Sequence, residues 1–98
     1  MKVLWTNLAY KRLEEIYSYI EEDSPTGAER WAEKLLNKVN GIKNFPRAGR
    51  AVPEVELESI REIIFGNYRI IYRIRDEIAY VLTVRHFKQI LPLEDIDE

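Results

Sequence analysis

The stretch NYRIIYRI, residues 67–74, has the alternating pattern of a β-strand, and the rest of the fold can be inferred outward from it. Side chains on a strand point alternately to its two faces, so residues two apart share a face. One face then carries tyrosines and isoleucines, which suit a hydrophobic core. The other face carries Arg69, Ile71 and Arg73. Because the whole chain has a formal net charge of −2, the question is what these arginines face.

Two more strands are predicted beside this one. IREIIF (60–65) precedes it across the turn 66–67, and IAYVLTVRH (78–86) follows it across the turn 76–77. Two-residue turns join antiparallel neighbours, so the three strands form a meander. In 78–86, strict alternation predicts Ile78, Tyr80, Leu82 and Val84 on the apolar face, and Ala79, Val81, Thr83 and Arg85 on the arginine face.

Two amphipathic helices are predicted before the meander. Apolar residues recur at helical spacing from Ala9 to Ile20 and again from Ala28 to Ile42. Thr6 or Asn7 can cap the first helix, Ser24 with Pro25 begins the second, and Asn44 with Pro46 stops it. The short link between the helices predicts an antiparallel hairpin.

The fold class that follows is α+β, with the element order β-α-α-β-β-β. The apolar run KVLW (2–5) is the first strand, and residues 46–59 are a connecting loop. We expect an antiparallel helical hairpin packed on one face of a mainly antiparallel twisted sheet. Residues 1–90 form a single domain in this interpretation, and residues 91–98 form an acidic C-terminal tail.

The composition describes one small domain without cysteine chemistry. The chain has 98 residues, and its 46% hydrophobic content is enough for a single core. Cysteine is absent and there is one histidine, so we expect no metal and no cofactor. The sequence has no apolar run near the roughly 20 residues that span a bilayer, and its N-terminus does not resemble a signal peptide. We therefore expect a cytoplasmic protein with no membrane partner.

An ordered set of motifs resembles the RelE/ParE superfamily of type II toxin–antitoxin toxins, which includes plasmid-stabilisation toxins. The motifs are WTNLAYKRLEEIYSYI, SPTGAERW, FPRAGRAVPE, REIIFGNYRIIYRI and YVLTVRH, and together they cover about residues 1–88. The resemblance implies a toxin that a cognate antitoxin protein wraps and neutralises, in a small homo- or hetero-oligomer. Two activities are implied: ParE-like toxins poison DNA gyrase, and RelE-like toxins cut mRNA on the ribosome. A third alternative is an inactive toxin fold that serves only as a binding module.

The resemblance to RelE-like nucleases implies Arg69, Arg61 and His86 as the catalytic set. Arg69 matches the arginine of their Y-R strand, Arg61 stands where their catalytic lysines begin, and His86 can act as acid or base. The second lysine is replaced by Ile63, and the C-terminal tyrosine has no counterpart. The sequence pI near 5.5 is also poor for a protein that binds RNA. These departures favour the ParE-like alternative. The structural alternative for His86 is a strand-end histidine that merely satisfies a hydrogen bond.

The arginine face has two interpretations. It is either an exposed charged face whose arginine stems cover apolar surface, or a surface on which an acidic and aliphatic antitoxin segment docks. The predicted partner-binding residues are Arg69, Ile71, Arg73, Arg85 and Arg50. Arg50 also has a structural alternative, in which it pairs with Glu54 or Glu62.

The tail ILPLEDIDE (90–98) alternates aliphatic and acidic residues. Residues 91–98 hold four acids and no base, whereas residues 43–90 hold nine basic and six acidic side chains. The tail either frays as a free terminus or folds over the basic face and mimics an antitoxin.

Overall fold

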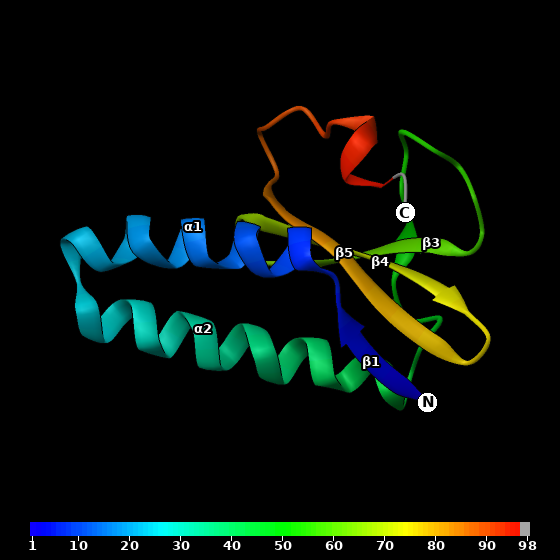
Figure 1. Cartoon of the computed structure of the whole chain (residues 1–98), viewed down its shortest axis with the longest axis horizontal. Helices are drawn as coiled ribbons and strands as arrows, with labels where there is room; N and C mark the ends of the chain where they lie inside the picture. The colour runs from blue at the N-terminus through cyan, green and yellow to red at the C-terminus, as the bar shows by residue number, and fades with distance from the viewer. Residues whose placement is uncertain (97–98) are drawn as a thin grey trace.

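A computed structural model describes residues 1–96, in which a helical hairpin covers one face of a five-stranded sheet (Figure 1). Residues 97–98 of the predicted tail lie outside the described residues. The elements are β1 (Lys2–Trp5), α1 (Asn7–Asp23), α2 (Pro25–Asn40), a 3₁₀ turn (Gly41–Lys43), β2 (Arg50–Ala51), β3 (Ile60–Phe65), β4 (Tyr68–Arg75), β5 (Ile78–His86) and a 3₁₀ turn (Leu93–Asp95). The predicted α+β fold and its element order are confirmed, with β2 as a short addition inside the predicted loop 46–59.

The sheet has the order β1-β5-β4-β3-β2. The β3–β4–β5 meander and the β2–β3 pair are antiparallel, while β1 pairs with β5 in parallel. The two meander turns both use positive φ angles. Gly66 has φ +58°, and Asp76 and Glu77 both have positive φ, as a two-residue hairpin with the right-handed strand twist requires.

Both helices begin at the predicted caps. The hydroxyl of Thr6 accepts a hydrogen bond from the Ala9 amide at 3.1 Å, and the hydroxyl of Ser24 accepts one from the Gly27 amide at 2.9 Å. These bonds satisfy amide groups that have no partner in the first helical turn. Helix α2 ends at Asn40, earlier than predicted, and the following 3₁₀ turn brings Ile42 into the core.

The main core lies between the helical hairpin and the sheet. It contains the buried residues Ala9, Leu35, Val39, Ile42, Ile70, Tyr72, Ala79, Val81 and Val84. The hydroxyl of Tyr72 donates to the Pro46 carbonyl at 2.7 Å and accepts from the Gly49 amide at 3.1 Å. Tyr72 therefore also ties the loop before β2 to the sheet, and burial raises the pKa of its hydroxyl.

A β-bulge changes the faces of β5 from those predicted. Tyr72 pairs with Val81 and Ile71 pairs with Thr83, so Leu82 is an extra residue on β5. One inserted residue reverses the alternation of side chains along the strand. After the bulge, Val84 lies on the helix side as predicted. Before the bulge, Ala79 and Val81 lie on the helix side too, and not on the predicted arginine face. The prediction that Tyr80 and Leu82 share the helix side is wrong, since both pack on the opposite face.

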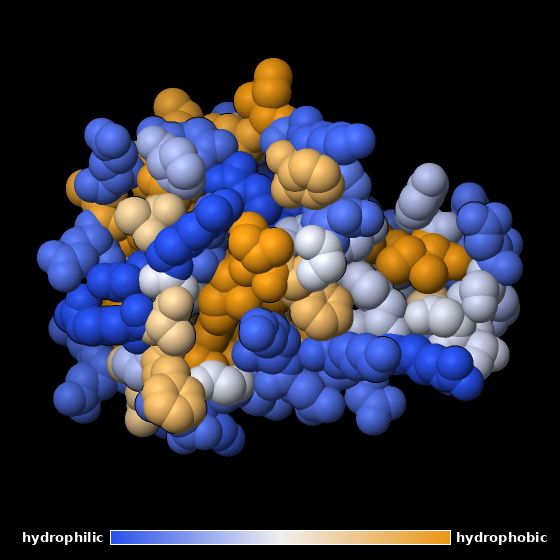
Figure 2. Space-filling model, turned by 180° about the vertical axis from the view of Figure 1, so that it is seen from behind, coloured by the Kyte–Doolittle hydropathy of each residue, from blue (hydrophilic) through white to orange (hydrophobic). Residues whose placement is uncertain are grey.

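That opposite face carries a second, smaller core, which the C-terminal segment completes. Leu91 and Ile96 are buried together with Val52, Ile60, Ile71 and Leu82. The segment turns back from the end of β5 and lies beside the loop that precedes β3 (Figure 1). Residues 91–96 are therefore folded over the sheet and not frayed. Seen from behind, apolar side chains project at the upper edge, where Figure 1 places this segment, and others form a band across the middle (Figure 2).

Candidate functional site

A buried network of ion pairs occupies the face of the sheet opposite the helices. Arg69 on β4 is only 7% exposed. Its Nε donates to Glu62 at 2.7 Å, and its two terminal nitrogens donate to the two oxygens of Glu54 at 2.8 Å each. The second oxygen of Glu62, which is 1% exposed, accepts from Nε of Arg50 at 2.7 Å. Arg50, Glu54, Glu62 and Arg69 are called the buried network below.

The strands bring these charges together by register. Glu62 on β3 is paired with Arg50 on β2 and with Ile71 on β4, so Arg69 is its diagonal neighbour on the same face. The loop 52–59 supplies Glu54. The hydrogen bonds that Glu54 accepts raise the pKa of Arg69 against the opposing effect of burial, and the same bonds, donated by Arg69, lower the pKa of Glu54. Each shift stabilises the charged form, so the network is a paired and satisfied one.

A second cluster holds the C-terminal segment on the same face. Asp95 is 1% exposed and accepts a hydrogen bond from the Thr83 hydroxyl at 3.0 Å. Arg12 from α1 donates to the other carboxylate oxygen of Asp95 at 3.4 Å, and Arg85 lies 3.9 Å from the oxygen that Thr83 binds. The Nε atoms of Arg12 and Arg85 are buried, and neither makes a hydrogen bond within the described residues. Arg12, Thr83, Arg85 and Asp95 are called the tail clasp below.

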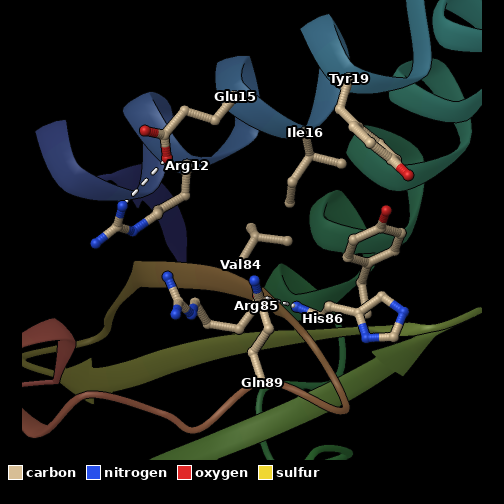
Figure 3. Close-up of a pocket in the computed structure, with 9 residues that line it drawn as sticks. Arg12, Glu15, Ile16, Tyr19, Val84, Arg85, His86 and Gln89 are labelled. Atoms are coloured by element: carbon tan, nitrogen blue, oxygen red, sulfur yellow. Dashed lines mark hydrogen bonds and ion pairs between the residues drawn. The ribbon is translucent and has the colours of Figure 1, made fainter.

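A pocket of about 360 Å³ lies next to the tail clasp, between α1 and the end of β5. It is lined by Arg12, Glu15, Ile16, Tyr19, Tyr68, Val84, Arg85, His86 and Gln89. Figure 3 shows Arg12, Glu15, Ile16 and Tyr19 projecting from α1 toward Val84, Arg85 and His86 on the strand. Arg12 is shared with the clasp. Burial disfavours its charge, but hydrogen bonds to Glu15 and Asp95 outweigh burial and raise its pKa.

His86 sits at the mouth of this pocket among aromatic rings. Its ring meets Tyr68 edge-on at 5.5 Å between centroids and stacks on Phe87 at 5.1 Å. Its Nδ1 accepts a hydrogen bond from the Lys88 amide at 3.1 Å. Burial raises the pKa of the neighbouring Tyr68, with a smaller contribution from Tyr19. His86 therefore makes a hydrogen bond of the kind that its structural alternative predicts, and its other ring nitrogen makes none to residues 1–96.

The structure does not bring the three predicted catalytic residues together. Arg61 pairs with Tyr72 across the strands and lies on the helix side of the sheet, where it donates to the Gly49 carbonyl at 2.8 Å. Arg69 lies on the other side. His86 pairs with Tyr68, and Tyr68 and Tyr72 are four residues apart on β4, which is about 13 Å along a strand. Arg61 thus lies on the side of the sheet opposite the arginine face.

The predicted partner-binding residues do share one face, but in this structure each is engaged within the chain. Arg69 and Arg50 belong to the buried network, and Ile71 is fully buried in the second core. Arg73 donates to the Ile96 carbonyl at 3.4 Å, and Arg85 belongs to the tail clasp. The pairing of Arg50 with Glu62 was one of its predicted alternatives. Partner binding by these five residues stays a prediction.

Five residues of these clusters were not predicted as site residues: Glu54 and Glu62 were named only as possible partners of Arg50, and Arg12, Thr83 and Asp95 were not singled out at all. Arg12 falls on the polar side of the first helix, and Thr83 is an ordinary strand residue. Asp95 is one of four acids in the tail, with no local signal that separates it from Glu94. The one available signal was the opposite charge of the tail and the arginine face. Among residues 1–96, no helix is long and apolar enough to cross a membrane, and no group of three or more His, Cys, Asp or Glu side chains is placed to hold a metal ion.

Comparison with known proteins identifies the family. Residues 3–91 match the family model described as the ParE toxin of type II toxin–antitoxin system, parDE. The chain belongs to the ParE toxin family. Membership of this family makes it a toxin of a type II toxin–antitoxin system, within the RelE/ParE superfamily that the motifs resemble.

Individual relatives agree with this assignment. A protein of Sinorhizobium fredii named "Putative toxin Y4kP" is 34% identical and covers 93% of both chains. Toxin RelE2 of Caulobacter vibrioides is 29% identical over 87% of this chain and 93% of its own. The structure titled "Chromosomal ParDE TA system from P. aeruginosa" superposes with a TM-score of 0.74 at 19% identity, over 88% of this chain and 95% of that chain. This last likeness shows that the ParE-family chain has the fold of a ParDE component.

Proposed function

We propose that this ParE-family chain acts on DNA gyrase, has no nuclease activity of its own, and is neutralised by a cognate antitoxin with which it forms a small hetero-oligomer. Gyrase is a cytoplasmic target, so the proposed site of action is the cytoplasm. The observation that carries the proposal is the separation of Arg61, Arg69 and His86, since Arg69 lies on the face of the sheet opposite the other two.

The chemistry of RNA cleavage explains why this separation matters. Transfer of a 2′-hydroxyl to the neighbouring phosphate needs a base, an acid and a cation within hydrogen-bond reach of one phosphate. Arg69 is already bound by both oxygens of Glu54 and one of Glu62. Arg61 is bound by backbone carbonyls. A phosphate would have to break these contacts before either arginine could stabilise its charge.

A ribosome-dependent endoribonuclease is the second candidate function. It is favoured by the pocket that places His86 within the same lining as Arg12 and Arg85, and by the relative named Toxin RelE2. In that case the catalytic cations would be Arg12 and Arg85, not Arg61 and Arg69.

Inducible expression in a bacterium separates these functions. Incorporation of labelled thymidine and labelled methionine is followed after induction, for the wild type and for His86→Ala. We expect thymidine incorporation to fall first, in both proteins, and the purified toxin to inhibit gyrase supercoiling.

An early fall of methionine incorporation that His86→Ala abolishes would refute the gyrase proposal and support the nuclease. Normal growth with both proteins, together with tight antitoxin binding, would refute both activities and leave the inactive binding module.

A further inference from the structure

The C-terminal segment covers a surface that would otherwise be exposed and apolar. Only some of its residues face the sheet. Leu91, Asp95 and Ile96 are buried, whereas Ile90 and Leu93 are 88% and 63% exposed. The residues that contact the sheet are therefore an aliphatic one, Leu91, an acid four positions later, Asp95, and a second aliphatic one directly after it, Ile96.

The surface beneath is complementary to that chemistry. Its apolar part is formed by Val52, Ile60, Ile71 and Leu82, all fully buried under the segment. Its polar part is the tail clasp, in which Thr83, Arg12 and Arg85 surround the one carboxylate of Asp95. Two positive charges surround one carboxylate, and the Nε–H groups of both arginines are buried without an acceptor among residues 1–96. The site therefore has capacity for a more closely placed acid.

The hold on the segment is weaker than the hold within the buried network. Arg12 and Arg85 approach Asp95 at 3.4 and 3.9 Å, whereas the charged contacts of Arg69 are all 2.7 to 2.8 Å. Charge-assisted hydrogen bonds are strongest near 2.7 to 2.9 Å. The network is therefore built into the fold, while the segment is held by two long charged contacts, one hydrogen bond from the Thr83 hydroxyl at 3.0 Å and two aliphatic side chains.

From these contacts we infer that the surface beneath residues 91–96 is a docking site for an antitoxin segment that presents an acidic residue beside aliphatic ones, and that the chain's own C-terminal segment competes for it. The inference rests on the proposed neutralisation by an antitoxin and adds where and by what chemistry it binds. The closed segment acts as a tethered competitor. The apparent affinity for the antitoxin is then the intrinsic affinity multiplied by the fraction of molecules in which the surface is uncovered.

Affinity for the purified antitoxin tests the competition in the full-length chain. Asp95→Asn keeps the size of the side chain but removes its charge from the clasp, which releases the segment. Glu94→Gln is the matched control, because the same change is made on the neighbouring exposed residue. We expect Asp95→Asn to bind the antitoxin about tenfold more tightly than the wild type and Glu94→Gln to bind like the wild type. A synthetic peptide of residues 88–98 should compete with the antitoxin for the Asp95→Asn protein.

Hydrogen exchange on the wild-type complex is a second readout that needs no substitution. The amides of Asp95 and Ile96 donate to Pro92 and Leu93 in the closed segment, and they should lose protection when the antitoxin binds. Equal affinity of all three proteins, or a segment that stays protected in the complex, would overturn the competition and leave the proposed function intact. Failure of the antitoxin to bind any of them would overturn both.

Discussion

Replacement of Arg69 by methionine should lower the free energy of unfolding of the protein. The effect should come from the buried network and not from a change at the surface. Arg69 is 7% exposed, and its loss leaves Glu62, at 1% exposure, with Arg50 as its remaining charged partner. Removing one member of a buried ion pair typically costs about 3–5 kcal/mol. The lower end applies because Arg50 remains and Glu54 can turn to water, so we expect a loss of about 3 kcal/mol.

Thermal and urea unfolding followed by circular dichroism measure this loss. For a domain of this size, about 3 kcal/mol corresponds to a fall in Tm of roughly 12–24 °C. The matched control is Arg47→Met, because Arg47 is 66% exposed and meets the exposed Glu58 at 3.4 Å. An exposed pair of this kind contributes at most about 1 kcal/mol.

A double variant identifies the cause of the loss. Adding Glu62→Gln to Arg69→Met removes the stranded carboxylate, so at least about half of the lost free energy should return. The reasoning would be refuted if Arg69→Met cost no more than Arg47→Met, or if Glu62→Gln made the single variant less stable. The result also decides how toxicity assays are interpreted, since loss of toxicity in an Arg69 variant would reflect unfolding.

Two further predictions concern the loop 52–59 and the β4–β5 turn. The pKa of Glu54 is lowered from its ordinary value of 4.5 by Arg69, so the stability that this carboxylate contributes is present above that value and is lost as the pH falls through its lower folded pKa. The difference in urea midpoint between wild type and Glu54→Gln should therefore be large at pH 7 and should shrink toward pH 3; a constant difference would contradict the role of the charge. Glu77 has φ +62° beside Asp76 at +52°, so Glu77→Gly should raise stability by about 0.5–1 kcal/mol in the same unfolding assay, and a fall in Tm would show that the Glu77 side chain has a stabilising contact.

Local features of the chain were predictable because their causes lie within a few residues. Thr6 and Ser24 cap the helices through amides three residues away. The turn after β4 was recognisable from the break between two alternating runs, and the faces of β4 followed from alternation alone. The family resemblance also came from motifs in order along the chain, so it did not depend on knowing which residues meet.

What the sequence by itself determined was the element order, the helical hairpin, the meander and the toxin family, because hydrophobic period, caps and turns are local. Only the tertiary structure decided the bulge at Leu82, since an extra residue on one strand is defined by the partner that it fails to match. It also decided that Arg69 is a buried network residue, because Glu54 is on a loop 15 positions earlier, and that Asp95 binds residues from α1 and β5. An arginine on a strand has the same local pattern whether it faces water or a carboxylate, and only the folding of distant segments over the sheet distinguishes the two.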